Sequence, residues 1–254
     1  MAGVKIRRFK VDDCTGPTLE VVGREARHAL RVLRLGVGDA VALFNGRGGE
    51  VVGRIASASR TGFTVSVPEQ AIPPCRDRAE RPALVLAVAT PKGSRADWLV
   101  EKCAELGVGA LWLLRAERGP VAPGPGKVER WRRKAVEAAK QAGQRRVMGI
   151  EPPRTVAEAL AAAAGGLVLY GDPACAKAAL LGVLHRPRIN TSAHEQIVIF
   201  IGPEGGFTDE ECGTIKAAGG VAVSLGESVL RVETAAIAAA VVWGMAPIEN
   251  DAPG

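Results

Sequence analysis

The sequence lacks the cysteine and histidine patterns that disulfide-rich and metal-binding proteins carry. It holds five cysteines, an odd number, scattered over 254 residues without a Cys-x-x-Cys pair. Such a set argues against a disulfide framework, and the missing pair argues against a zinc site. The three histidines also lack the spacing that is typical of metal ligands. We therefore expect no metal in this protein.

Long hydrophobic runs are absent as well. No apolar stretch reaches the roughly 18 residues that a membrane span needs, and the longest candidate is Ala235–Trp243. The N-terminus, MAGVKIRRFKV, lacks the apolar core of a secretory signal and the length of a transit peptide. A hydrophobic fraction of 47% is ample for a folded core. These features predict a soluble cytoplasmic protein without a membrane partner.

Acidic side chains are scarce in two regions and abundant in a third. Residues 1–75 carry 11 basic and 7 acidic side chains, and residues 115–146 carry 10 and 3. Residues 190–254 carry 2 basic and 9 acidic ones, although the whole chain has a net charge of +6. Clustered basic residues favour a polyanionic partner such as nucleic acid, with ordinary solubility as the alternative.

The proline- and charge-rich stretch Gln70–Arg81 indicates a domain boundary, which we place after residue 75. The first part alternates short strand-like runs around one helix at Arg24–Leu33, which favours a small β-barrel. Its expected strands are Val4–Val11, Thr18–Val22, Ala40–Asn45, Glu50–Ser57 and Gly62–Val67.

Residues 76–254 alternate buried-strand runs with helical stretches, the pattern of an α/β domain. The expected strands are Pro82–Ala89, Leu111–Leu114, Leu167–Tyr170, Ile197–Ile201 and Val221–Leu225. The expected helices are Ser94–Leu106 with Ser94 as its cap, Lys127–Gly143, Val156–Ala164, Ala174–Leu184, a helix capped by Thr208 that ends at Gly219, and a last helix from about Glu233. His185–Glu195 is expected to be a connector.

Two strand–loop–helix units within Ile197–Ala240 predict a ligand site. The first strand ends in Gly-Pro-Glu-Gly-Gly at 202–206, and the second runs into the loop Gly226–Arg231. Loops at the carboxyl ends of adjacent parallel strands form the cleft in which open α/β sheets bind ligands. Their glutamates, and the absence of a lysine after the glycines, argue against a phosphate cradle. They suit a ligand with positive charge and hydroxyl groups, such as S-adenosylmethionine.

The order of these motifs is also that of a known family. GPEGG followed by LG-x-x-x-LR-x-ET at 225–234 resembles the bacterial small-subunit ribosomal-RNA uridine-N3 methyltransferases, the RsmE branch of the SPOUT superfamily. The helix string LVEKCAELGV and the segment from His28 to Arg34 resemble the same family. The resemblance covers the chain from about Arg7 to its end, and departs from the family pattern at Gln144 and Met148.

This resemblance implies a fold and a function. The fold is a PUA-like β-barrel RNA-binding domain, residues 1–75, followed by a SPOUT-type α/β domain, residues 76–254, with a trefoil knot and cofactor loops within about 167–240. The function is S-adenosylmethionine-dependent methylation of N3 of a specific uridine in 16S ribosomal RNA. The implied partners are ribosomal RNA, within an assembled small ribosomal subunit, and a second copy of the chain in a homodimer.

The resemblance also implies roles for particular residues. Arg231 would stabilise negative charge on the uracil oxygens, and Glu233 would accept the N3 proton or orient Arg231; the alternative is a plain ion pair between the two. The implied contacts to S-adenosyl-L-methionine come from Leu169, Tyr170, Gly171, Gly202, Pro203, Glu204, Gly205, Leu225, Gly226, Val229, Leu230 and Thr234. The implied RNA contacts come from Arg27, Arg31, Arg34, Lys92, Arg115, Arg145 and Arg146.

Two other functions stay open at this point. One is a related SPOUT methyltransferase that acts on another RNA base or on a ribose. The other is an RNA-binding ribosome assembly factor whose cleft performs no catalysis. Cofactor binding separates the second alternative from both enzymes.

Overall fold

The computed structural model describes residues 6–68, 82–172, 178–184 and 196–246. The chain divides into two compact units, one of Met1–Asp77 with Ala139–Val147 and one of Arg78–Ala138 with Met148–Gly254. The boundary expected after residue 75 and the expected connector His185–Glu195 lie outside the described residues. Within the described part, no helix is both long and apolar enough to cross a membrane.

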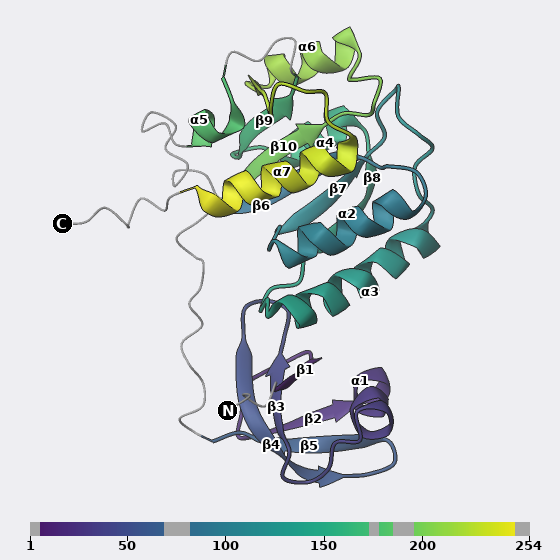
Figure 1. Cartoon of the computed structure of the whole chain (residues 1–254), viewed down its shortest axis with the longest axis vertical. Coiled ribbons are helices and arrows are strands. Elements are labelled where there is room, and N and C mark those ends of the chain that lie inside the picture. The colour runs from purple at the N-terminus through teal and green to yellow at the C-terminus, as the bar shows by residue number, and fades with distance from the viewer. Residues whose placement is uncertain (1–5, 69–81, 173–177, 185–195, 247–254) are drawn as a thin grey trace, which may run out of the picture. The chain divides into compact units, whose positions relative to one another are not determined.

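The N-terminal unit is built on a five-stranded sheet (Figure 1). The strands follow the order β1-β3-β4-β5-β2, and only β1 pairs in parallel with its neighbour, β3. Alternate strand residues point into one apolar core that contains Phe9, Val41 and Phe63. The five expected strands are confirmed as β1 (Arg7–Lys10), β2 (Thr18–Val22), β3 (Ala40–Phe44), β4 (Glu50–Ala58) and β5 (Gly62–Ser66).

The expected helix at Arg24–Leu33 forms in two different geometries. It begins as the α-helix α1 (Gly23–Arg27) and continues as the π-helix η1 (His28–Val32). The Leu33 N–H donates to the carbonyl oxygen of His28, 3.0 Å away and five residues earlier. Ala26 and Ala29 are buried on the core side of this helix, so its arginines stay on the exposed side.

Residues 139–147 belong to the N-terminal unit because Arg8 holds them there. The Arg8 guanidinium pairs with Glu50, 2.7 Å away, and donates to the carbonyl oxygens of Ala139 and Gln144 at 3.1 and 3.0 Å. A cation near the C-terminus of a helix is favourable, because the carbonyl groups there carry partial negative charge. The helix in question is α3 (Pro125–Ala142).

The C-terminal unit contains a six-stranded sheet in which every pair of neighbours is parallel. The order is β11-β9-β10-β6-β7-β8, and the predicted α/β class with a parallel sheet is confirmed. The strands are β6 (Ala83–Ala89), β7 (Ala110–Leu114), β8 (Gly149–Arg154), β9 (Leu167–Gly171), β10 (Gln196–Ile201) and β11 (Val221–Val223).

Two features of this sheet differ from expectation. The strands of the two loop-bearing units, β10 and β11, are not adjacent, because β9 lies between them and pairs with both. β8 was not expected, since its sequence GIEPPR contains two prolines. Its place at the end of the strand order explains the prolines, because an edge strand needs fewer backbone donors.

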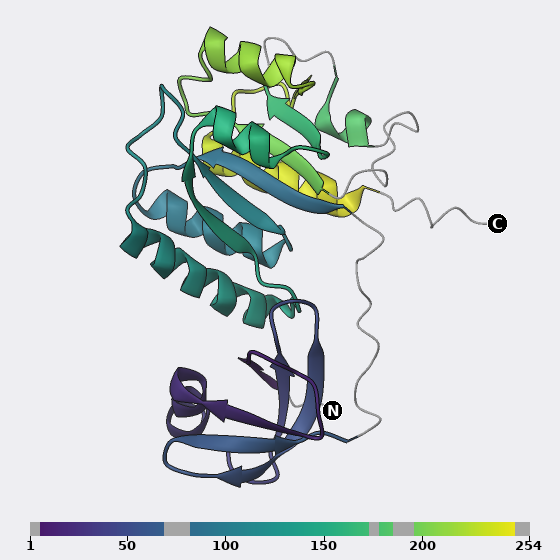
Figure 2. The ribbon, with the colours of Figure 1, turned by 180° about the vertical axis from the view of Figure 1, so that it is seen from behind.

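Helices cover both faces of this sheet, as the two opposite views show (Figures 1 and 2). On one face α2 (Ser94–Glu105) packs beside α7 (Val232–Met245), and α7 contacts β6. On the other face α4 (Val156–Ala162) and α6 (Asp209–Ala217) cover a core that includes Trp112, Tyr170 and Phe200. The short α5 (Leu180–Leu184) contacts α7.

The helix ends confirm some sequence signals and correct one. Thr208 caps α6 in a complete capping box with Glu211, and Gly219 follows that helix with φ +82°. The expected cap of α2 by Ser94 is wrong. Gly93 occupies the N-cap position with φ +66°, a conformation that favours glycine, and no side chain caps the helix.

Candidate functional site

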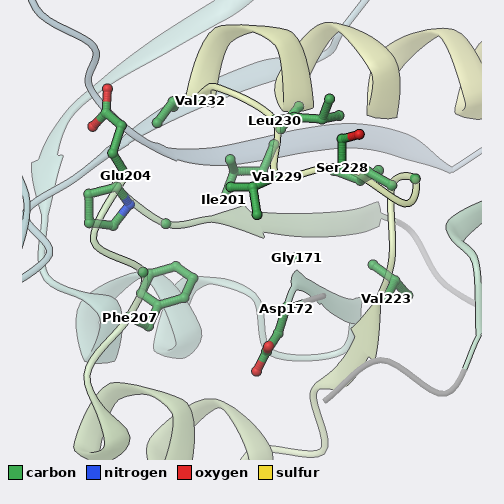
Figure 3. Close-up of a pocket in the computed structure, with 16 residues that line it drawn as sticks. Gly171, Asp172, Ile201, Glu204, Phe207, Val223, Ser228, Val229, Leu230 and Val232 are labelled. Carbon is green, nitrogen blue, oxygen red and sulfur yellow. The ribbon is translucent and has the colours of Figure 1, made fainter. Parts of the chain in front are cut away.

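A cavity of about 190 Å³ opens at the carboxyl ends of three neighbouring strands, β9, β10 and β11 (Figure 3). In the close-up, Glu204 and Phe207 lie on one side of it and Val223 and Ser228 on the other. Its lining residues come from the strand ends, from the two loops and from the first turn of α7: Gly171, Asp172, Ile201, Gly202, Pro203, Glu204, Gly206, Phe207, Val223, Leu225, Gly226, Ser228, Val229, Leu230, Val232 and Ala235.

The first loop, residues 202–207, is a tight turn that an arginine from another segment of the chain stabilises. The Gly206 N–H donates to the Pro203 carbonyl at 2.8 Å, and Gly206 has φ +70°. Arg118, which follows β7, donates to the Gly205 carbonyl at 3.2 Å. A Cβ at Gly202 would lie 3.2 Å from the Phe207 ring, so glycine allows this close approach.

The second loop, residues 224–231, is fixed by a serine at its start. The Ser224 hydroxyl accepts from the Gly226 N–H at 3.2 Å and donates to the Gly226 carbonyl at 2.7 Å. This local turn presents Val229 and Leu230 to the cavity. Val229 is 83% exposed, so the cavity is open to solvent on this side.

The chemistry of the lining fits S-adenosylmethionine. The side chains are mostly apolar, and the two charged ones, Asp172 and Glu204, are acidic. Among the described residues that line the cavity there is no lysine or arginine, which a phosphate group would require. Glycines at 171, 202 and 226 let a ligand reach the backbone N–H and C=O groups. An apolar wall suits an adenine ring, and the carboxylates suit the sulfonium and ammonium charges.

The structure brings most of the predicted cofactor residues to this cavity. Four of the twelve do not line it: Leu169 and Tyr170 are buried in β9, Gly205 lies against Arg118, and Thr234 is exposed on α7. The prediction missed eight lining residues, all within two positions of a predicted one: Asp172, Ile201, Gly206, Phe207, Val223, Ser228, Val232 and Ala235.

The two predicted catalytic residues lie next to the cavity. Arg231 is exposed and occupies the N-cap position of α7, between the lining residues Leu230 and Val232. The Glu233 side chain is 7% exposed and pairs with Arg95 of α2, with 3.6 Å between Nη1 and Oε1. Its Oε2 is buried, and no residue of the described ranges gives it a hydrogen bond. Glu233 thus pairs with an arginine that the sequence did not single out.

The predicted RNA-binding residues differ in the contacts that they make within the protein. Arg27, Arg31, Arg34 and Lys92 are exposed, and none of the ion pairs between described residues includes them. Arg115 pairs with Glu158 at 3.0 Å, and the Arg145 Nε lies 2.9 Å from the Glu50 carboxylate. Arg146 forms a β-bridge with residues 46 and 47. The exposed arginines of the first group belong to the α1–η1 segment and its end.

Comparison with known proteins identifies the class to which this fold and site belong. Residues 79–244 match the family described as RNA methyltransferase domain, and residues 23–67 match the RNA methyltransferase PUA domain. The chain is therefore an RNA methyltransferase-type protein with an N-terminal PUA-like domain.

Individual relatives show to which family of RNA methyltransferases the chain belongs. The chain is 33% identical to the ribosomal RNA small subunit methyltransferase E of Synechocystis over 86% of its own length and 70% of that protein. A putative methyltransferase from Legionella pneumophila, solved with bound SAM, is 28% identical with a TM-score of 0.79, covering 94% and 97% of the two chains. The small subunit methyltransferase E of Neisseria gonorrhoeae, bound to S-adenosyl methionine, is 25% identical with a TM-score of 0.78, covering 93% and 95%. This chain belongs to the ribosomal RNA small subunit methyltransferase E family.

Proposed function

We propose that this protein transfers a methyl group from S-adenosylmethionine to N3 of a uridine in small-subunit ribosomal RNA. The observation that carries the proposal is the acidic and apolar cavity where the GPEGG loop meets the 224–231 loop. The family membership supports it, and so do the relatives whose structures hold S-adenosylmethionine.

The proposed role of the cavity residues is to bind S-adenosylmethionine and to orient it. Val223, Leu225 and Leu230 offer apolar surface to the adenine, and the backbone of Gly226 is open for hydrogen bonds with it. Asp172 and Glu204 lie at the cavity and complement positive charge. When bound, S-adenosylmethionine supplies an electrophilic methyl group on a sulfonium. The protein's main contribution is then to align the base with that methyl group.

Arg231 is the proposed catalytic group. Loss of the N3 proton leaves negative charge on the uracil ring, and a guanidinium stabilises charge on the flanking oxygens. The exposed position of Arg231 beside Leu230 leaves its side chain accessible to an incoming base. Glu233 is buried on the α2 side and lies outside the cavity lining. We therefore propose that Glu233 acts by fixing the first turn of α7, and we assign the proton to no side chain.

The RNA partner is proposed to meet the exposed arginines of the N-terminal unit. Arg27, Arg31 and Arg34 share one exposed segment, and such residues contact phosphates and set the register of the RNA. Lys92 is exposed as well, Arg146 is exposed at its β-bridge with residues 46 and 47, and Arg115 and Arg145 would have to leave carboxylate partners. Assembly as a homodimer, a trefoil knot in the α/β domain and action on an assembled subunit are part of the same proposal.

The experiment is a calorimetric titration with S-adenosylmethionine on the wild type, on Gly171→Val and on Gly124→Val. A Cβ at Gly171 meets only ordinary contacts of 3.8 and 3.9 Å, and because Gly171 lines the cavity, the larger side chain of valine takes up space that the ligand would use. Gly124 is in open space away from the cavity and is the matched control. We expect Gly171→Val to weaken binding at least 100-fold and the control to bind like the wild type.

Product analysis completes the test. The protein is incubated with labelled S-adenosylmethionine and either naked small-subunit RNA or assembled subunits, and the nucleosides are separated by mass spectrometry. N3-methyluridine is the expected product. A different methylated nucleoside would replace the base assignment with a related RNA methyltransferase. Binding without transfer to any RNA would favour the assembly factor, and a folded wild type that binds no S-adenosylmethionine would refute the enzyme.

A further inference from the structure

Arg95 is a charged residue at the candidate site that sequence motifs did not single out. It is the second residue of α2, and its side chain is 36% exposed. Its Nη1 lies 3.4 Å from Oε1 of Glu204 and 3.6 Å from Oε1 of Glu233. One guanidinium therefore faces two carboxylates that come from different elements of the site.

The two carboxylates belong to two segments that line the cavity. Glu204 belongs to the GPEGG loop and lines the cavity, and Glu233 follows directly after the lining residue Val232. In Figure 3 Glu204 and Val232, the first residue of α7, lie at the same end of the cavity. A single cation between them removes the repulsion that two neighbouring carboxylates would otherwise exert.

The burial of Glu233 makes this cation important. Its side chain is 7% exposed, and Oε2 has no hydrogen-bond partner among the described residues. A buried carboxylate needs a compensating charge or hydrogen bonds to stay in place. Arg95 is the one cation that the described ion pairs place beside it.

We propose that Arg95 is a positioning residue, which ties the GPEGG loop to the first turn of α7 and so sets the width of the cofactor cavity. The inference rests on the proposed function for its meaning, because the cavity is the proposed S-adenosylmethionine site. The bridge leaves the three side chains with a net charge of −1. A cationic ligand is therefore still attracted, while the loops no longer repel each other.

Three variants test the bridge. Arg95→Met keeps an unbranched apolar stem, which ends at the level of the arginine Nε, and removes the charge. Arg95→Lys keeps the charge, but its side chain is one bond shorter than the chain that carries Nη1 to the two carboxylates. Arg130→Met is the matched control, because Arg130 of α3 pairs with Asp97 of α2 at 2.7 Å, and no ion pair between described residues joins it to either loop.

The first readout needs no cofactor. Amide hydrogen exchange of the free protein is measured in the segments 203–207 and 232–236. We expect exchange in both segments to be at least tenfold faster in Arg95→Met, intermediate in Arg95→Lys and unchanged in Arg130→Met. Exchange rates within twofold of the wild type in Arg95→Met would overturn the proposal.

The second readout is the affinity for S-adenosylmethionine, by calorimetry. We expect Arg95→Met to bind at least tenfold more weakly, with partial recovery in Arg95→Lys. Glu204→Gln should cost less affinity in the Arg95→Met background than in the wild type, since coupled residues are not additive; additive losses would overturn the bridge. If the folded wild type binds no S-adenosylmethionine, the proposed function fails, and hydrogen exchange still decides the role of Arg95.

Discussion

Replacing Glu211 with glutamine removes a single charge in the first turn of α6, where the Glu211 side chain accepts a hydrogen bond from the backbone of Glu117. Glu211 is 8% exposed, and its two oxygens serve different partners. Oε2 accepts from the Thr208 N–H at 2.9 Å, within the capping box of α6, and Oε1 accepts from the Glu117 N–H at 3.0 Å. Glutamine has one acceptor oxygen, so it can retain one of these bonds only.

The expected cost follows from the bond that is lost. A hydrogen bond to a charged group is worth about 1.5–3 kcal/mol, and a buried N–H left without a partner adds to that loss. We expect Glu211→Gln to destabilise the C-terminal unit by about 2–4 kcal/mol. For a unit of this size that corresponds to a fall in melting temperature of roughly 4–16 °C.

The chain offers a matched control in a second capping box. Thr155 and Glu158 cap α4 in the same way, but Glu158 is exposed, and its Oε2 accepts from both the Thr155 N–H and Arg115. Glutamine at 158 can therefore keep the capping bond with its one oxygen.

The assay is urea and thermal unfolding of both variants, followed by circular dichroism and by amide exchange in α6. We expect Glu211→Gln to unfold at clearly lower temperature and urea concentration than the wild type, and Glu158→Gln, which loses the charge of its acceptor but keeps the capping bond, to lose much less stability. Equal stabilities for the two variants would refute the argument that the second acceptor matters.

Three further predictions concern two glycines and the pH dependence of stability. A Cβ at Gly53 would overlap the Ser66 carbonyl oxygen on the neighbouring strand, so Gly53→Ala should destabilise the N-terminal unit by about 1–3 kcal/mol in urea unfolding. Gly213 has open space within α6, so Gly213→Ala should instead stabilise the protein by about 0.5–1 kcal/mol, and a loss there would contradict the reasoning. The backbone N–H of Thr155, which donates to the Glu158 carboxylate, is the main cause that lowers the pKa of Glu158 below 4.5. Because the folded-state pKa is the lower one, this stabilisation is present above pH 4.5 and is lost as the pH falls through the folded-state pKa. The stability gap between the wild type and Glu158→Gln should therefore shrink between pH 7 and pH 3, and a constant gap would contradict it.

The sequence by itself determined those features that depend on a few neighbouring residues. Strand runs ended by glycine and proline predicted β10 and the 202–206 loop, and Thr208 with the acids after it predicted the start of α6. These signals are reliable because a capping box or a glycine turn is completed within about four residues of chain. The motif order of GPEGG and LG-x-x-x-LR-x-ET also indicated the family.

Only the tertiary structure decided which distant residues meet. It placed β9 between β10 and β11, and it tolerated the prolines of β8 because that strand ends the sheet. It paired Glu233 with Arg95, 138 positions earlier, whereas the sequence suggested Arg231, two positions away. Local propensity carries no information about such pairs, because they depend on how strands and helices pack after they have formed. The first turn of α2 thereby became part of the site.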